Sequence, residues 1–364
     1  MKILTVVGAR PQFIKAATVS REILRRAAEA PLAEVLLHTG QHFDHNMSET
    51  FFQELDIPRP QYNLDVHGGS HGEMTGRMLA GIEAVLKDER PDWVLVYGDT
   101  NSTLAAALAA VKLGVPIAHV EAGLRSFNMR MPEEINRILT DRVSARLFCP
   151  TDVAVRNLEA EGLRAGVQQV GDVMYDAALF YGEGARYGED VLDRLGLRGR
   201  PFVLATCHRA ENTDDARRLR GVVQALNALA RELPVVLPLH PRTRAILERL
   251  AIPLADGVRV CDPLPYLDMV CLERNCRVVL TDSGGVQKEA YFYGVPCVTM
   301  RDETEWVETV EAGWNKLAGA DPEAILAAAS AYLSGRPSGR PALYGDGRSA
   351  TRIVDALVAG VDAA

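Results

Sequence analysis

Short apolar runs alternate with amphipathic stretches along most of the 364-residue chain. The runs are rich in Val, Ile and Leu at consecutive positions, which is typical of strands buried on both faces of a parallel sheet. The stretches between them carry apolar residues at helical spacing, so the pattern predicts repeated strand–helix–strand units. In the first half, the predicted strands are 3–7, 34–38, 93–97, 116–120 and 146–149, and the predicted helices are 13–28, 102–113 and 133–143.

The second half of the chain repeats this pattern, and a length of 364 residues favours two domains. We therefore predict an α/β fold with two Rossmann-like, doubly wound domains that face a cleft. The Gly-rich, polar segment "GEGARYGED" marks the join, and the expected parts are 1–170, 171–345 and a C-terminal helical segment 346–364 that packs back across the domains. The predicted strands here are 202–206, 235–239, 258–261, 278–281 and 297–300, and the predicted helices are 216–231, 243–250, 285–293, 322–333 and 350–361.

Composition and charge narrow the class of protein. Hydrophobic residues make up 48% and charged residues 24%, as in an ordinary globular enzyme, and the formal net charge of −8 disfavours a partner that is a nucleic acid. Because no apolar stretch approaches the roughly 18 residues of a membrane span and no signal peptide precedes the first strand, we expect a cytoplasmic protein with no membrane partner. The six cysteines form no C-x-x-C pair, so we expect buried thiols.

Polar and charged residues follow several of the predicted strands at the point where each strand ends. Ligands of open α/β sheets bind at the carboxyl ends of the strands, which makes these residues candidates for a functional site. They are Arg10 and Lys15 after the first strand, Asp99 after 93–97, Glu121 and Arg125 after 116–120, His208 and Arg209 after 202–206, and the segment "DSGGVQKE" after 278–281.

The segment "DSGGVQKE" has the most specific pattern. Ser283 can cap the following helix, and Gly284 and Gly285 let a ligand approach the backbone N–H groups at the positive end of that helix. The sequence therefore predicts an anion site. Glu289, under two turns further on, can accept hydrogen bonds from two vicinal hydroxyls, as on a ribose. The alternative is a capped helix that carries a surface glutamate.

Three carboxylates of the first domain, Asp99, Glu121 and Glu133, lie at strand ends or at a helix start. Like charges that crowd in a partly dry cleft raise the pKa of at least one group, which suits one carboxyl to donate a proton and another to accept it. The alternative at each position is a salt bridge, and Glu133 lies four residues before Arg137 on one helix face. His208 is a candidate general base or phosphate donor, although a single histidine is often structural.

These residues lie in motifs that resemble the non-hydrolysing UDP-N-acetylglucosamine 2-epimerases over essentially the whole chain. The resemblance implies the glycosyltransferase-B architecture of two facing Rossmann-like domains, a homodimer, and a reaction on a UDP-sugar that needs neither a metal nor a nicotinamide cofactor. The matching stretches are "GARPQFIK", "TGQH", "GDTNST", "HVEAGLRS", "PEEINR", "HRAEN", "DSGGVQKEA" and "ALYGDG".

The resemblance also implies a mechanism and a role for each candidate residue. The family inverts C2 of its sugar: UDP is eliminated with loss of the C2 proton to give a glycal, and UDP then adds back while a proton arrives on the opposite face. The implied catalytic residues are Asp99, Glu121, Glu133 and His208, the last also in contact with diphosphate. The implied substrate-binding residues are Arg10, Lys15 and the supporting Arg137, then Ser283, Gly284 and Gly285 for phosphate, Glu289 for ribose, and Leu264, Tyr266 and Met269 for uracil.

The chain departs from the family pattern in several places. Trp306 stands where many members carry a substrate-side Arg, and other details resemble the branch that acts on UDP-2,3-diacetamido-2,3-dideoxyglucuronate. The predicted substrate is therefore UDP-N-acetylglucosamine or, as the alternative, that glucuronate. More distant alternatives are a UDP-sugar glycosyltransferase, which would not need three carboxylates around C2, a hydrolysing epimerase, and a sensor without turnover. Candidate allosteric residues, by resemblance, are Gln41, His42, Glu134 and His240.

Overall fold

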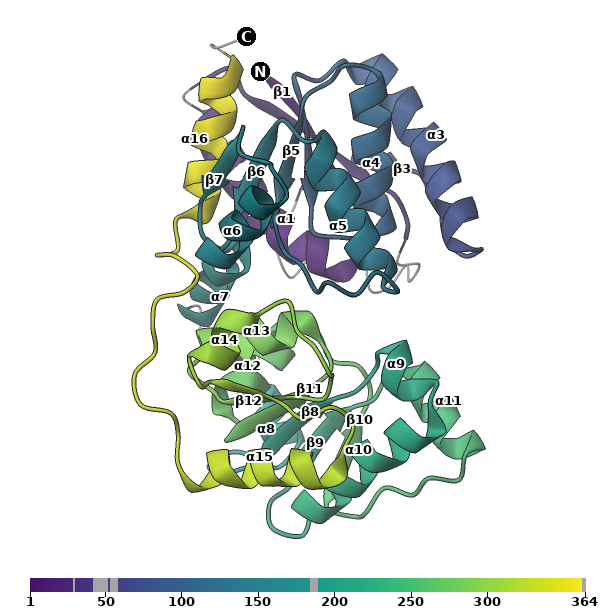
Figure 1. Ribbon diagram of the computed structural model, residues 1–364, viewed down its shortest axis with the longest axis vertical. Helices are drawn as coiled ribbons and strands as arrows, with labels where there is room; N and C mark the ends of the chain where they lie inside the picture. Colours follow the sequence, from purple (N-terminus) through teal and green to yellow (C-terminus); the bar gives the residue numbers. More distant parts are fainter. Residues whose placement is uncertain (29, 42–51, 53–57, 184–188, 362–364) are drawn as a thin grey trace. The chain divides into compact units, whose positions relative to one another are not determined.

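The chain forms two compact units in the computed structural model (Figure 1). The first unit comprises Met1–Leu179 and Ala342–Ala364, and the second comprises Phe180–Pro341. The structure describes residues 1–28, 30–41, 52, 58–183 and 189–361, so the candidate residue His42 lies outside the described part. The chain passes from the first unit to the second within helix α7 (Val173–Glu183).

The first unit is built on a parallel sheet with the strand order β3-β2-β1-β4-β5-β6-β7. Strand β1 lies between β2 and β4, with Val6 opposite both Leu37 and Val96. The order reverses beside β1, as it does in dinucleotide-binding folds. The strands are β1 (Lys2–Val7), β2 (Ala33–His38), β3 (Tyr62–Asn63), β4 (Trp93–Tyr97), β5 (Ile117–Val120), β6 (Arg146–Cys149) and β7 (Val167–Gln169).

The helices of the first unit pack on this sheet and on one another. Leu4 and Val6 of β1 join one core with the apolar faces of α3 and α4, in which small alanines allow close approach. Helix α16, the last in the chain, lies against α1, where Arg26 and Asp355 form an ion pair of 2.6 Å. The helices are α1 (Arg10–Ala27), α3 (His71–Glu89), α4 (Asn101–Lys112), α5 (Pro132–Val143), α6 (Asp152–Ala160) and α16 (Ser349–Val361).

The second unit repeats the architecture with the strand order β10-β9-β8-β11-β12-β13. Its strands pair in parallel, and the order again reverses beside the first strand of the unit, β8. The strands are β8 (Val203–Thr206), β9 (Val235–Pro238), β10 (Val258–Cys261), β11 (Val278–Thr281), β12 (Cys297–Thr299) and β13 (Asn315–Leu317). The helices are α8 (Glu189–Arg194), α9 (Ala210–Thr213), α10 (Ala216–Leu229), α11 (Pro241–Arg249), α12 (Tyr266–Asn275), α13 (Gly284–Phe292), α14 (Val307–Glu311) and α15 (Pro322–Ser334).

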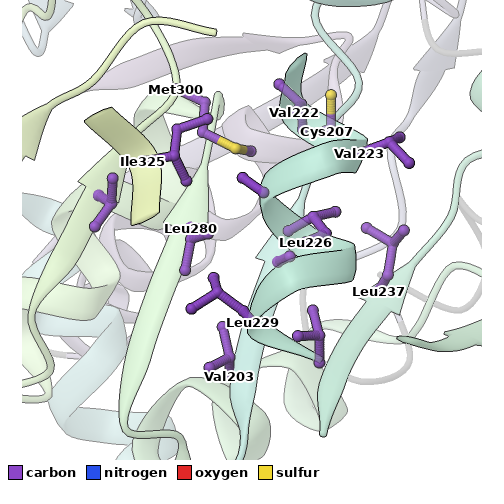
Figure 2. Close-up of a cluster of buried hydrophobic side chains, with 14 of the residues drawn as sticks. Val203, Cys207, Val222, Val223, Leu226, Leu229, Leu237, Leu280, Met300 and Ile325 are labelled. Carbon is purple, nitrogen blue, oxygen red and sulfur yellow. The ribbon is translucent and has the colours of Figure 1, made fainter. Parts of the chain in front are cut away.

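Successive residues of the second sheet enter two different cores. Val203 of β8 and Leu280 of β11 pack with Leu226 of α10 and Ile325 of α15 in the core shown in Figure 2. The alternate residues Leu204 and Val279 pack instead with α8, α12 and α13. Because side chains alternate across a strand, a sheet with apolar residues at every position is covered by helices on both faces.

The predicted α/β class with two doubly wound domains is confirmed. Every predicted strand is present, with ends that differ by a residue or less. The pattern missed the short strands β3, β7 and β13, because two or three residues show no periodicity. It also missed α3, which has few buried positions, and the helices α6, α7, α8, α9, α12 and α14. All six cysteines are free thiols, and only Cys261 among them is partly exposed. No helix in the described ranges is long and apolar enough to cross a membrane.

Candidate active site

The candidate residues gather where the strand order reverses in each sheet. In the first sheet this point lies between β1 and β4, and in the second it lies between β8 and β11. The chains leaving two such neighbouring strands run to opposite sides of the sheet and leave a crevice at the carboxyl ends, where ligands bind. Lys15 and Asp99 follow the first pair of strands, and His208 and Ser283 follow the second pair.

The turn between β1 and α1 is tightly packed. A Cβ on Gly8 would lie 2.1 Å from Thr39 Oγ1 and 2.2 Å from Ser102 Oγ, so only glycine fits there. The side chain of Gln12 then accepts the N–H groups of Gly8 and Ala9, both at 2.9 Å, and fixes the first turn of α1. This turn carries Arg10 at the first position of the helix and places Lys15 just over one turn further on.

Lys15 and Glu121 form a nearly buried ion pair beside Gly98. Glu121 follows β5 with a φ of +73°, in the left-handed region that glutamate rarely adopts. A Cβ on Gly98 would lie 3.0 Å from Lys15 Nζ and 3.2 Å from Glu121 Oε2, so the glycine leaves room for the pair. Strained backbone of this kind is concentrated at functional sites, since only surrounding structure can hold it.

Asp99 is the second carboxylate of the first-unit site and pairs with Arg137. The Arg137 Nη2 to Asp99 Oδ2 distance is 2.5 Å, and the Arg137 Nη1 to Glu134 Oε2 distance is 2.7 Å. Asn136 donates to the backbone carbonyl of Asp99 at 2.8 Å. We refer to Lys15, Asp99, Glu121 and Arg137 as the first-unit cluster.

Helix α5 turns its polar face inward to reach this cluster. Glu134, Arg137 and Asp141 recur at helical spacing and are buried, whereas Ile135 and Leu139 are 40% and 43% exposed. An amphipathic helix ordinarily does the opposite. The inversion shows that α5 packs its charged side chains under the ends of β4 and β5 rather than on an apolar core.

The three carboxylates of the first domain differ in their partners. Asp99 and Glu121 are both paired, but with different cations, and the pairs lie at neighbouring strand ends. Arg137 pairs with Glu134 and not with Glu133, which is half-buried and forms no ion pair with any described residue. Glu134 also accepts the N–H groups of Ser126 and Phe127 at 2.9 and 2.8 Å, so it shapes the loop before α5.

In the second unit, the buried carboxylate of Asp282 organises the site. It accepts the backbone N–H groups of His208 and Arg209, with distances of 3.0 and 3.1 Å for His208 and 3.0 Å for Arg209. It also accepts Asn212 Nδ2 at 3.2 Å, and the His208 ring lies 3.4 Å away. The loop after β8 is thereby fixed beside the end of β11, with His208 exposed and Arg209 partly exposed.

The N-terminus of α13 is open to an anion. Ser283 occupies the N-cap position, but its hydroxyl makes no capping hydrogen bond. A Cβ on Gly284 would lie 3.6 Å from Trp306 Nε1, 3.8 Å from Glu305 Oε2 and 4.0 Å from Arg209 Nη2. The Glu305 carboxylate is paired with Arg301, so the two donors and the N–H groups at the start of the helix are left to meet an anion. We refer to His208, Arg209, Ser283, Gly284 and Gly285 as the second-unit anion site.

Trp306 is supported from within the unit by a buried cation. The Lys288 Nζ atom lies 3.9 Å from the centre of the Trp306 ring, and both side chains are buried. Lys288 is four residues after Gly284 and therefore on the same face of α13. The stacked cation fixes the indole beside the anion site.

Glu289 is buried, so the alternative of a surface glutamate is wrong. It lies near the phenol of Tyr266, whose pKa is raised by burial and then by the charge of Glu289. A Cβ on Gly285 would lie 4.0 Å from Glu289 Oε2. The other two residues predicted to contact uracil, Leu264 and Met269, are partly buried against the same core as α12 and α13.

The candidate allosteric residues are divided between the two units. Gln41 accepts the backbone N–H and the hydroxyl of Ser102 at 3.0 and 2.7 Å in the first unit. Glu134, on α5, pairs with Arg137 and accepts the N–H groups of Ser126 and Phe127, as described above. His240 is an exposed N-cap of α11 in the second unit, where its Nδ1 accepts the Arg242 N–H at 3.2 Å.

Sequence reasoning gave no role to three residues of these sites. Arg209 was noted only as a neighbour of His208, although its guanidinium lies beside Gly284. His119 and Asp141 are fully buried and joined by a 2.7 Å contact under the first-unit cluster. The sequence signal for His119 is a histidine inside the apolar strand 116–120, and the signal for Asp141 is a charged face on the helix 133–143.

Comparisons with known proteins identify the family of the chain. Residues 25–358 match the family model described as UDP-N-acetylglucosamine 2-epimerase. A Pseudomonas aeruginosa protein named UDP-2,3-diacetamido-2,3-dideoxy-D-glucuronate 2-epimerase is 58% identical over 98% of this chain and 99% of its own length. A Methanococcus maripaludis UDP-N-acetylglucosamine 2-epimerase is 42% identical over 97% of both chains.

A solved structure extends the comparison to the fold. The Methanocaldococcus jannaschii UDP-GlcNAc 2-epimerase, in complex with UDP-GlcNAc and UDP, superposes with a TM-score of 0.92 at 40% identity and covers 99% of this chain and 100% of its own. Its family has the glycosyltransferase-B-like fold, as predicted. The chain therefore belongs to the UDP-N-acetylglucosamine 2-epimerase family of isomerases.

Proposed function

We propose that this protein inverts C2 of a UDP-2-acetamido sugar by eliminating UDP to a glycal and adding it back. The observation that carries the proposal is the first-unit cluster, in which Asp99 and Glu121 stand at neighbouring strand ends, each against its own cation. Two separately held carboxylates suit a reaction that removes a proton from one face of a carbon and returns one to the other face.

The first-unit cluster supplies the proton transfer. The C2 proton is weakly acidic, so the base that takes it must be positioned closely. Asp99 and Glu121 act as the acid–base residues, together with Glu133 at the start of α5. Arg137 and Lys15 orient their carboxylates, and Arg10 faces the diphosphate and sugar.

The second-unit anion site holds the nucleotide and stabilises it as it departs. Negative charge grows on the β-phosphate when the bond to C1 breaks, and preorganised N–H and cationic donors stabilise that charge. The N–H groups of Gly284 and Gly285, with Ser283 and the side chains of His208 and Arg209, fill this role. Glu289 accepts the ribose hydroxyls, and the backbone around Leu264, Tyr266 and Met269 meets the uracil.

The preferred sugar is UDP-2,3-diacetamido-2,3-dideoxy-D-glucuronate. The relative that is 58% identical is named for this substrate. The Lys288–Trp306 stack beside Gly284 supports the assignment, because it gives this region a ring and a fixed N–H in place of a guanidinium. UDP-N-acetylglucosamine is the second candidate, since relatives at 42% and 40% identity are named for it.

The deciding experiment is incubation with each UDP-sugar in deuterated water, followed by NMR. We expect deuterium at C2 of both epimers while UDP remains attached at equilibrium, with faster turnover of the glucuronate. Inversion without deuterium would rule out proton abstraction. Accumulation of free UDP and sugar would indicate a hydrolase instead.

We further propose a homodimer as the working form. In support, Ile135 and Leu139 leave an apolar stripe exposed on α5, and Phe127 in the loop before it is 77% exposed. A single species of dimer mass in light scattering is the expected result, and a monomer at micromolar concentration would contradict it.

A further inference from the structure

A row of buried charged groups lies under the ends of β4 and β5. His119 of β5 is fully buried, with its Nδ1 2.7 Å from Asp141 Oδ1 and its Nε2 2.8 Å from the carbonyl oxygen of Gly98. Asp141 in turn pairs with Arg125 at 2.8 Å, and Arg125 pairs with Glu161. The side chains of His119, Arg125 and Asp141 are all buried.

Both ring nitrogens of His119 face groups that accept hydrogen bonds. A backbone carbonyl has no hydrogen to give, so Nε2 donates to Gly98. Asp141 is a carboxylate: burial raises its pKa, but the hydrogen bonds and charges of His119 and Arg125 outweigh burial, and the pKa is lowered. The two ring nitrogens of His119 therefore link the Asp141 carboxyl group to the Gly98 carbonyl.

The carbonyl that His119 holds belongs to the turn of the first-unit cluster. Gly98 has a φ of +62°, and a Cβ on it would lie 3.0 Å from Lys15 Nζ and 3.2 Å from Glu121 Oε2. Asp99 is the next residue along the chain. The Gly98–Asp99 peptide thus sets the position of Asp99, and Gly98 lies next to the ion pair between Lys15 and Glu121.

The opposite end of the row holds the loop that follows β5. Asp141 Oδ2 accepts the N–H of Gly123 at 3.1 Å and the guanidinium of Arg125 at 2.8 Å. Arg125 makes a bidentate contact with Glu161, at 2.7 and 2.8 Å. This loop begins with Glu121 in its strained conformation. The Asp141 carboxylate therefore links the two strand ends that carry Asp99 and Glu121. One of its oxygens contacts His119, which holds the Gly98 carbonyl, and the other accepts the N–H of Gly123.

We propose that His119, held between Asp141 and the Gly98 carbonyl, is the positioning residue that sets Asp99 against Glu121 for proton transfer at C2. The proposal rests on the proposed function. His119 acts through the Gly98–Asp99 peptide and does not contact the substrate. Its removal should therefore slow the proton transfer and leave the nucleotide bound as before.

The test compares two variants at His119. His119→Phe keeps a ring and removes both donors, and His119→Gln restores one uncharged donor. We expect His119→Phe to lower kcat by up to about 100-fold, as for a misplacement of about 1 Å, and to leave KM and the Kd for UDP within about twofold. His119→Gln should recover part of kcat. As a matched control, His38→Phe replaces another buried histidine of the same sheet, one that packs on Phe13, and should leave kcat within about twofold.

Unchanged kcat in both variants, or an equal loss of kcat and UDP affinity, would overturn the positioning role. Wild-type protein that fails to exchange the C2 proton would overturn the proposed function instead.

Discussion

The two units have the same strand order but build their strand-end sites in different ways. The first-unit cluster is a set of ion pairs whose second partners come from α1 and α5, with buried charges beneath them. The second-unit anion site consists mainly of backbone N–H groups, with glycine at the helix start and a single carboxylate, Asp282, that holds the loop after β8. Carboxylates suit proton transfer, and N–H groups suit an anion.

The buried carboxyls of the units show the same contrast. Asp141 in the first unit lies against His119 and Arg125, and its pKa is lowered. Glu273 in the second unit is buried to the same degree with another carboxylate, Glu289, nearby, and burial followed by that charge raises its pKa well above the usual range. Equal burial therefore accompanies pKa shifts in opposite directions, because Asp141 pairs with Arg125 whereas Glu273 lies near a second carboxylate.

The largest effect is expected for Asp99→Asn. An amide keeps the shape of the side chain but cannot exchange a proton, so kcat should fall about 10²- to 10⁴-fold. Calorimetry should show UDP affinity within about twofold of the wild type, because the nucleotide is assigned to the second unit. Asp152→Asn, at the exposed start of α6, is the matched control and should change neither quantity. An equal loss of UDP affinity in Asp99→Asn would remove the distinction between the two sites.

Glu289→Ala should weaken UDP binding more than catalysis, which is the reverse of the result expected for Asp99→Asn. Loss of a charged partner for the ribose should weaken UDP binding by about 1.5–3 kcal/mol, while kcat at saturating substrate changes little. Glu323→Ala, on the exposed face of α15, should bind UDP as the wild type does. Unchanged UDP affinity in Glu289→Ala by calorimetry would mean that this buried carboxylate does not meet the ribose.

A smaller effect concerns the choice of sugar. Arg is a planar, permanently charged donor, whereas Trp offers a ring and one N–H. We expect Trp306→Arg to shift the ratio of kcat/KM toward UDP-N-acetylglucosamine by about tenfold, which corresponds to about 1.4 kcal/mol. The measurement is a competition between the two UDP-sugars.

The Lys288–Trp306 stack adds a control to that experiment. An arginine at 306 would stand against the Lys288 ammonium, so the double variant Lys288→Gln/Trp306→Arg should show the shift more fully than the single variant. Lys288→Gln alone should change the ratio least. A wild type that prefers UDP-N-acetylglucosamine, with no shift in any variant, would make Trp306 a neutral difference.

The sequence predicts the fold and the position of each site more completely than the contacts within them. Apolar runs such as 203–206 are buried whichever way they face, so strands and strand-end residues follow from the pattern. The pairing of Arg137 with Asp99 and Glu134 rather than with Glu133 depends on the direction of a helix face, and α5 inverts the usual rule by exposing Ile135. Residues that act through tertiary contacts, such as His119 and Asp141, show in the sequence only as a polar residue in an apolar strand and a charge on a helix face, and neither identifies the partner.

The smallest effect is expected for Glu273→Gln and appears in stability rather than activity. The pKa of Glu273 is raised in the folded protein, so the folded state holds this proton at pH values where the unfolded chain has lost it. The contribution of Glu273 to stability is therefore fully present below the unfolded pKa of about 4.3. It is lost as the pH rises from that value toward the pKa of the folded state. Glutamine has no proton to lose and should escape this penalty. From pH 4 to pH 8, the stability of the variant should therefore rise relative to that of the wild type. Thermal unfolding of both proteins across this range gives the measurement, with the exposed Glu323→Gln as control. A difference that stays constant with pH would show that Glu273 ionises in the folded protein, and the contrast with Asp141 would then fail.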